Sequence, residues 1–573
     1  MSNKNRLELY FTAILPELRR VAEPVAGRST PYTLFFSISD GESRARVVTA
    51  RGATLDEAWQ RGVAAIRESV QRRSLDVRWL RIDHVDAIEE MNWAELNKRL
   101  TSTKRNYFRF GISLDAAFGN AFLETELNGN AMLYKGGEIA HCVVNDNNFL
   151  RYAKARHGIT ALDFADDKAV WMFSARGLFV GEDLAVHRLA GPGLDMGARA
   201  SMDKIAPPDD AGRRIIEKLT LGDVEHLIHS SSAYLATQVN DEGKFRYGWF
   251  PCFNREIDTY NTLRHASSVY AMLEGWEVTR DEATKTGIDR SLAYLANTLI
   301  KRVELPSGER AAFLVDINGE IKLGGNAVSV LAFVKYTQIT GDEQYLPLLD
   351  ELAAGILHMR NPETGMLIHV LNYPALDVKA EFRIIYYAGE AAFSLMRLYE
   401  LANNERWIDA VERMFGIFIK EDYWKAHDHW LSYATNALTR YRPKPEFFEF
   451  GIRNFAGYLN FVIQRITTFP TLLELMMAAE QMVTRLKTEH PELLQTVDVE
   501  KFYYALEKRA HYLLNGFFWP ELAMFYAKPS AIVGSFFIRH HAFRVRIDDV
   551  EHYLSGYVAY RKYLLANAGN VPT

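Results

Sequence analysis

Three segments of this chain share one pattern, and their spacing constrains the fold more than any other feature of the sequence. Each segment opens with small residues, continues as an apolar helix and ends at an acidic or amide residue, at Asp281, Asp342 or Asn404. These end points are therefore 61 and 62 residues apart. A repeat of this length, which holds an apolar helix, a polar turn and a second helix, is typical of helical hairpins that stack on one another.

Length and composition limit the class of protein. A chain of 573 residues exceeds one ordinary core and predicts two or three domains, and 48% apolar with 24% charged residues excludes a disordered chain. A net charge of −5 gives no field that would attract nucleic acid or an anionic membrane. The two cysteines, Cys142 and Cys252, cannot form a disulfide framework or a zinc site by themselves, and they suit a reducing compartment.

The first twenty residues carry charges throughout, and no window approaches 18 uncharged apolar residues. We therefore expect neither a secretion signal nor a membrane span, and we predict a cytoplasmic protein.

The first 200 residues contain short strand-like runs between helical ones. Residues 32–39 and 45–50 flank an Asp40-Gly41 corner and predict a β-hairpin. Further strands are expected at 77–82, 107–112, 131–134, 139–144 and 169–173. Phosphate-loop and GxSxG motifs are absent from this part of the sequence. Because Pro and Gly interrupt regular structure, the runs at 191–193 and 207–212 predict a linker. The sequence thus indicates a multidomain α+β protein, with an α+β module at 1–205 and a domain of helical hairpins at 213–573.

From about Ile215 onward the sequence is helical, with apolar residues such as Val269, Met272, Leu273 and Trp276 on one helix face. Strand-like tongues rich in Gly and aromatic residues separate the helices, at 243–250, 311–316 and 365–370. This alternation resembles the (α/α) toroid superfamily of carbohydrate-active proteins, the six-hairpin glycosidase-like barrels, over roughly residues 215–565. The run 386–391, Tyr-Tyr-Ala-Gly-Glu-Ala, is similar to a helix start in the C-terminal domain of glucuronyl C5-epimerases. The resemblance implies a closed ring of helices and a sugar or polysaccharide ligand.

In such a ring the inner helices begin at one rim, so residues at their starts converge. As catalytic candidates this nominates Tyr260, His265, Tyr387 and Glu390, and as substrate-binding candidates Asn261, Arg264, Asn326, Arg383 and Tyr386. Free N–H groups at helix starts favour an anionic ligand, which Arg264 and Arg383 could clamp. Two structural alternatives remain open, since Glu390 could complement its own helix dipole and Asn326 could serve as a helix cap.

The segment 424–433 gathers two histidines, an aspartate, two tryptophans and a tyrosine. His427, Asp428 and His429 are consecutive and do not share a helix face, so we predict no metal site there. Asp428 or His429 could act as a general acid or base, while Trp430 and Tyr433 stack on sugar rings, although aromatic residues at this spacing also pack in cores. Arg453 adds a cation to the wall of an acidic-substrate groove or to a solvated face.

Taken together, the sequence predicts a protein that acts on a sugar or anionic glycan by general acid/base chemistry, as an epimerase, lyase or glycoside hydrolase. The tyrosine-rich rim favours proton abstraction beside a carboxylate. The alternative is a non-catalytic glycan-binding or assembly factor of envelope-polysaccharide production, since a fold does not dictate an activity. No cofactor and no nucleic-acid partner are expected, and the N-terminal module would assist recognition or assembly.

Overall fold

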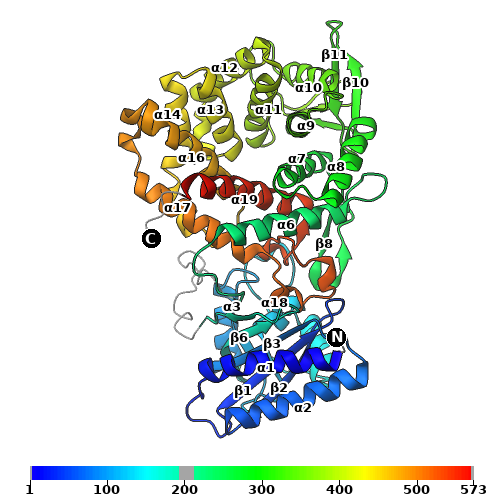
Figure 1. The fold of residues 1–573 in the computed structure, drawn as a ribbon, viewed down its shortest axis with the longest axis vertical. Helices are drawn as coiled ribbons and strands as arrows, with labels where there is room; N and C mark the ends of the chain where they lie inside the picture. Colours follow the sequence, from blue (N-terminus) through cyan, green and yellow to red (C-terminus); the bar gives the residue numbers. More distant parts are fainter. Residues whose placement is uncertain (1–2, 193–211, 569–573) are drawn as a thin grey trace.

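The computed structural model describes residues 3–192 and 212–568. Figure 1 shows two parts, a β-sheet with flanking helices formed by the N-terminal residues and a ring of helices formed by the rest. The Pro- and Gly-rich runs that we predicted as a linker fall largely outside the described residues. Among the described residues, no helix combines the length and the apolar character needed to cross a bilayer.

The N-terminal part is built on a seven-stranded antiparallel sheet in the order β2-β1-β3-β6-β4-β5, with β7 paired to β6. The predicted hairpin is confirmed, since Tyr32 pairs with Gly52 across β1 and β2. The strands expected at 131–134 and 139–144 were wrong: these residues form turns and an isolated bridge at His141. The strands are β1 Tyr32–Ser39, β2 Arg46–Gly52, β3 Trp79–Asn92, β4 Gly111–Ser113, β5 Ala121–Phe122, β6 Ala169–Val180 and β7 Val186–Leu189.

Helices cover this sheet because each presents an apolar stripe. On α1, Leu7, Tyr10, Ile14 and Leu18 recur at helical spacing and are all buried in one hydrophobic cluster with the strands. Thr54 caps α2 by accepting a hydrogen bond from the Glu57 backbone N–H at 3.2 Å. The helices are α1 Asn3–Val21, α2 Leu55–Arg73, α3 Trp93–Ser102, α4 Glu124–Gly129 and α5 Asp146–His157.

Twelve helices of the described chain alternate between an outer and an inner layer. Each inner helix packs against the next one, and the last, α19, packs against the first, α7, so the ring closes and the predicted (α/α) toroid is confirmed. The inner helices are α7 Thr262–Thr279, α9 Leu323–Thr340, α11 Tyr386–Ala402, α13 His429–Tyr441, α16 Thr471–Glu489 and α19 Ile547–Asn567. The outer helices are α6 Leu221–Gln238, α8 Glu282–Tyr294, α10 Leu346–His358, α12 Glu405–Lys420, α14 Pro445–Ala456 and α17 Val499–Tyr512.

The two layers differ in sequence for a physical reason. Every residue of α9 from Leu323 to Thr337 is buried, because an inner helix has helices on several sides. The outer helix α12 instead buries one stripe that includes Trp407, Val411 and Phe415, and its other face is polar. Two short helices, α15 Leu459–Gln464 and α18 Pro520–Ala523, lie in the connections.

Short β-tongues lead into the starts of inner helices. β9 Arg255–Glu256 precedes α7, β12 Glu320–Lys322 precedes α9, β14 Val378–Ala380 precedes α11 and β15 Val545–Arg546 precedes α19. They pair with β8 Gly248–Phe250 and β13 Val370–Asn372, while β10 Ile300–Glu304 and β11 Arg310–Leu314 form a separate hairpin. Because inner and outer helices alternate in direction, all these tongues gather at one end of the ring.

Buried charged groups join the sheet to the ring. The Arg44 guanidinium donates to the carbonyl oxygens of Gly129 at 2.5 Å, Phe525 at 2.6 Å and Cys252 at 2.9 Å. Arg539, which precedes α19, pairs with Glu124 on α4 at 2.8 Å. Buried charges that are paired and hydrogen-bonded avoid the large cost of desolvation, so these contacts hold the connection between α17 and α19 against the sheet.

Candidate functional site

A cavity of about 220 Å³ opens where the inner helices begin, and we call it the mouth cavity. Five of the six inner helices line it, because their first turns converge on the ring axis. Half of the sequence-predicted site residues contribute to its wall: Asn261, Arg264, Tyr386, Tyr387, Glu390, His429 and Trp430. The remaining wall residues are Leu263, Ser267, Ile384, Thr471, Asp548, Glu551 and His552.

His429 is held by the start of its own helix. Asp428 caps α13 by accepting hydrogen bonds from the backbone N–H groups of Trp430 and Leu431, at 3.3 and 3.0 Å. Its Oδ1 also lies 3.1 Å from His429 Nδ1. This contact favours the tautomer with the proton on Nδ1 and the lone pair on Nε2. His429 Nε2 is buried and has no hydrogen-bond partner among the described residues, so it is available to a ligand in the mouth cavity.

His552 on α19 is the second imidazole of the site, and its ring centre lies 5.6 Å from that of His429. Its Nδ1 lies 2.9 Å from Glu474 Oε2 and 3.6 Å from Glu551 Oε1. Burial lowers the pKa of His552, but the carboxylates of Glu551 and Glu474 outweigh burial and raise the pKa to about 10. His552 is therefore a cation at neutral pH, and its partner Glu474 also lies 3.9 Å from His429 Nε2.

Glu390 is a buried carboxyl group in the wall of the mouth cavity. Burial raises its pKa, and the carboxylates of Asp428 and Glu551 raise it further, to about 8. Its Oε2 atom is buried without a hydrogen-bond partner among the described residues. Gly324 makes room for it, because a Cβ at Gly324 would lie 1.9 Å from Glu390 Oε2. Glu390 is thus mostly protonated at neutral pH and can donate a hydrogen bond.

Two arginines predicted to clamp an anion are already paired. Arg264 Nε lies 2.9 Å from Asp548 Oδ2, and its guanidinium also contacts the Tyr247 hydroxyl. Arg383 makes two contacts with the Glu320 carboxylate, at 2.8 and 3.1 Å, and lies outside the mouth cavity. The hydrogen bonds from Arg383 outweigh the opposing effect of burial and, with other donors, lower the pKa of Glu320 to about 2. The same hydrogen bonds raise the pKa of Arg383. Arg383 is thus paired with Glu320 and does not line the mouth cavity.

Three more predicted residues serve the scaffold. Tyr260 and His265 bond to each other at 2.8 Å, and His265 Nε2 lies 3.0 Å from the Ser291 carbonyl, which ties α7 to α8. Burial lowers the pKa of His265 to about 4, so it is neutral. Asn326 is fully buried and satisfies two backbone groups of β11, accepting from the Leu314 N–H at 2.8 Å and donating to the Ala312 carbonyl at 2.9 Å. The polar atoms of these residues are thus hydrogen-bonded within the fold.

The last three predicted residues lie on or near α13. Asp428 caps the helix and positions His429, but it does not line the mouth cavity. Tyr433 lies one turn after Trp430 and lines a different cavity, at the far end of the ring. Arg453 is exposed on the outer helix α14, where its guanidinium lies 5.7 Å from the Trp424 ring centre. Position along a helix decides which cavity a side chain reaches.

The sequence analysis missed the contribution of the last two inner helices. Glu474 on α16 and Asp548, Glu551 and His552 on α19 complete the site. A signal was present, since the acidic and histidine cluster 548–552 directly follows an Arg-rich tongue and starts an apolar helix. The three segments that share the sequence repeat end at Asn404, so α19, the helix that closes the ring, lies outside them.

His429, Glu474 and His552 also form a set that could hold a divalent cation. Each offers one ligand atom, and these atoms lie within 4.8 Å of one another. Two imidazole nitrogens and a carboxylate are ligands that Zn²⁺ accepts in catalytic sites. The prediction of no metal considered only residues 427–429, and therefore did not weigh this set.

Comparisons with known proteins give little beyond the ring. No family model and no curated protein matches the chain. Among solved structures, D-mannose isomerase is 11% identical, with a TM-score of 0.47 over 61% of this chain and 100% of that one. Cellobiose 2-epimerase from Bacillus thermoamylovorans is 10% identical, with a TM-score of 0.46 over 60% and 99%. The GH76 α-mannanase of Bacteroides thetaiotaomicron is 9% identical, with a TM-score of 0.42 over 60% and 97%. At this similarity the site must be interpreted from its own geometry, and the resemblance to glucuronyl C5-epimerases stays a prediction.

Proposed function

We propose that this protein is a sugar epimerase or isomerase that moves a proton at the carbon next to the sugar carbonyl. The observation that carries the proposal is the pair of imidazoles at the mouth cavity, whose ring centres lie 5.6 Å apart: His552 is paired with Glu474, whereas His429 Nε2 has no hydrogen-bond partner among the described residues. A base and an acid held on two sides of one small space are what reversible proton transfer at carbon requires.

Three residues of the mouth cavity each have one role in the reaction. In an open-chain sugar, the C–H bond beside the carbonyl breaks and its proton passes to His429 Nε2. The electron pair of that bond forms the carbon–carbon double bond of an enediolate, while the π pair of the carbonyl moves onto its oxygen. Glu390, protonated near neutral pH, hydrogen-bonds the oxygen on which charge develops. His552 returns a proton to carbon, and solvent restores the starting protonation of both imidazoles. No oxidant or reductant is needed, because the sugar is only rearranged.

The charges of the mouth cavity favour a neutral sugar over the anionic glycan that we first expected. Arg264 is neutralised by Asp548 at 2.9 Å. Glu390 and Glu551 add further carboxyl groups to the same wall. An anionic ligand gains little where each cation already has a partner, and this also weakens the lyase alternative. Trp430, with its ring 5.0 Å from that of His429, offers an apolar face for the sugar C–H groups.

Solvent exchange tests the proposal. The protein is incubated in D₂O with neutral hexoses and disaccharides, including D-mannose, D-glucose and cellobiose, and deuterium next to the carbonyl is followed by NMR. His429→Asn is expected to slow exchange at least about 100-fold with unchanged helicity. His427→Asn is the matched control, because His427 binds the Asn454 carbonyl at 2.8 Å, away from the mouth cavity. Exchange that survives in His429→Asn would refute the assignment.

Glycoside hydrolysis is the second candidate, and the raised pKa of Glu390 favours it. A carboxyl group that is protonated near pH 7 can serve as general acid toward a leaving-group oxygen, with Glu551 or Asp548 as the second carboxylate. Mass spectrometry of disaccharide products separates the two reactions, because hydrolysis adds one water and epimerisation adds none. Binding with neither product would support the non-catalytic glycan-binding or assembly factor.

A further inference from the structure

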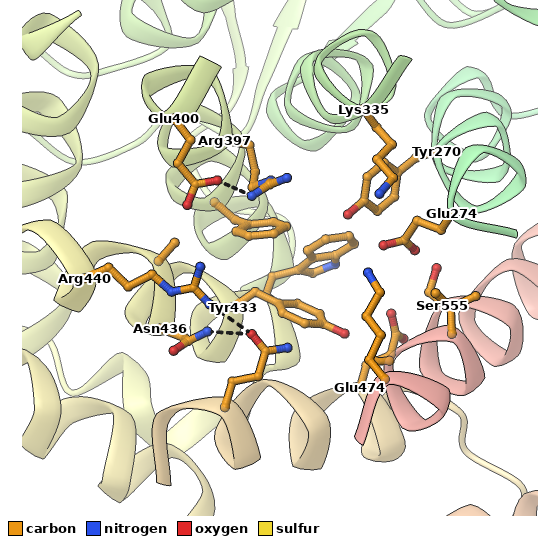
Figure 2. Close-up of a pocket in the computed structure, with 17 residues that line it drawn as sticks. Tyr270, Glu274, Lys335, Arg397, Glu400, Tyr433, Asn436, Arg440, Glu474 and Ser555 are labelled. Carbon is orange, nitrogen blue, oxygen red and sulfur yellow. Dashed lines mark hydrogen bonds and ion pairs between the residues drawn. The ribbon is translucent and has the colours of Figure 1, made fainter. Parts of the chain in front are cut away.

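A second cavity, of about 190 Å³, lies at the opposite end of the ring axis, and we call it the rear cavity. All six inner helices line it, mostly with residues further along each helix than the residues at the mouth. On α7, for example, Ser267 lines the mouth cavity and Glu274 lines the rear cavity. On α19, His552 lines the mouth cavity and Lys562 lines the rear cavity. Figure 2 shows side chains such as Lys335, Glu274 and Ser555 directed toward one common space.

The rear cavity joins an aromatic surface to polar groups. The rings of Phe393 and Tyr433 are stacked with centres 5.3 Å apart, and Trp430 lies 6.0 Å from each. Opposite them, the buried Glu274 carboxyl interacts with the hydroxyls of Ser555 and Tyr270, and burial raises its pKa. A carboxyl group and two hydroxyls beside aromatic faces suit a ligand with hydroxyl groups and apolar C–H faces.

Three of the four cations that line the rear cavity are compensated within the protein. Arg397 forms an ion pair with Glu400 and donates to Gln338 at 2.7 Å. Lys335 pairs with Glu277 at 2.7 Å, and Lys562 lies 3.5 Å from the same carboxylate. The fourth cation, the exposed Arg440, donates to the Gln481 side chain at 3.3 Å. Because most of these charges are compensated, a charged ligand gains little in the cavity.

We propose that the rear cavity is a second saccharide-binding site, specific for neutral sugars and separate from the site of reaction. The two sites share a wall. Trp430 lines both cavities, and Glu474 lines the rear cavity while it contacts His552 of the mouth cavity at 2.9 Å. A sugar in the rear cavity therefore touches two groups that also shape the mouth. This second site does not depend on the proposed reaction.

The test counts bound sugars in the full-length protein by calorimetric titration with D-mannose and with cellobiose, and locates them in soaked crystals. The wild-type chain is expected to bind two molecules of at least one probe. Ala559→Phe fills the rear cavity from α19 and should leave one bound molecule. Ala566→Phe, at an exposed position of the same helix, is the matched control and should leave two. Ser555→Ala, which removes only a hydroxyl, should weaken binding at the rear about threefold to tenfold.

Two results would overturn the proposal. The first is a wild-type protein that binds at most one sugar and holds only water in the rear cavity. The second is an Ala559→Phe variant that still binds two sugars. The outcome is independent of the proposed reaction. Two bound sugars without deuterium exchange would refute the proposed reaction and support the second site. Deuterium exchange with one bound sugar would support the reaction and refute the second site.

Discussion

The carboxyl group of Glu390 makes a prediction that unfolding experiments can test without a substrate. Burial, with Asp428 and Glu551 nearby, raises its pKa from 4.5 to about 8 in the folded protein. Between these two pH values the unfolded chain releases the proton and the folded chain retains it, so folding becomes less favourable as pH rises. The loss begins near pH 4.5 and is complete just above pH 8, and the shift corresponds to at most about 5 kcal/mol.

Glu390→Gln removes this penalty, because an amide of nearly the same shape cannot ionise. Near pH 5 the free energies of unfolding of the variant and the wild type should agree within about 1 kcal/mol. At pH 9 the variant should be more stable by several kcal/mol, with about 5 as the upper limit. Urea titrations at both pH values, followed by circular dichroism, measure the difference. The control is Glu449→Gln, at an exposed position of α14, whose effect should not depend on pH.

The test depends on how much the effect of Glu390→Gln on the free energy of unfolding differs between pH 5 and pH 9. If Glu390→Gln changes stability equally at pH 5 and pH 9, Glu390 ionises normally in the folded protein. Its assignment as a proton donor at the mouth cavity would then be wrong. A variant that is strongly destabilised at pH 5 would show that the protonated carboxyl makes hydrogen bonds that the amide cannot replace.

Three further predictions concern separate parts of the molecule. Asn326→Ala should reduce the free energy of unfolding, measured in urea, by about 2–4 kcal/mol, because it leaves two buried backbone groups of β11 unpaired. A loss of sugar binding at unchanged stability would show instead that Asn326 contacts the ligand. Tyr387→Phe should preserve stability and raise the KM for the sugar about threefold to tenfold, since Tyr387 lines the mouth cavity and the variant loses a hydroxyl that a bound sugar would contact. An unchanged KM would remove Tyr387 from the substrate contacts. After dialysis against EDTA, the deuterium exchange rate should stay within about twofold of the rate before dialysis. A loss of rate above about tenfold that added Zn²⁺ restores would mean that His429, Glu474 and His552 hold a catalytic ion.

Helical periodicity predicted the stacked helical hairpins, and the resemblance to the (α/α) toroid superfamily implied that they close into a ring, but neither gave the direction of each side chain. Asn326 and Glu390 both lie in the first two turns of inner helices. Asn326 points outward to β11, whereas Glu390 faces the mouth cavity. The sequence held both alternatives open, because the rotation of a helix about its own axis depends on its neighbours. Close packing at Gly389, where a Cβ would lie 2.6 Å from Asp428 Oδ2, sets that rotation for α11.

The local sequence determined the helices, their apolar stripes and the tongues between them, because propensity and periodicity act over a few residues. It also determined that polar groups gather at the starts of the inner helices. Tertiary structure alone decided which of those groups meet. Closure of the ring brings α19 against α7 and α16, and so places His552 beside Glu474 and His429. That juxtaposition arises from packing between helices far apart in sequence, and the states of these groups depend on burial and neighbouring charge, which no local pattern contains.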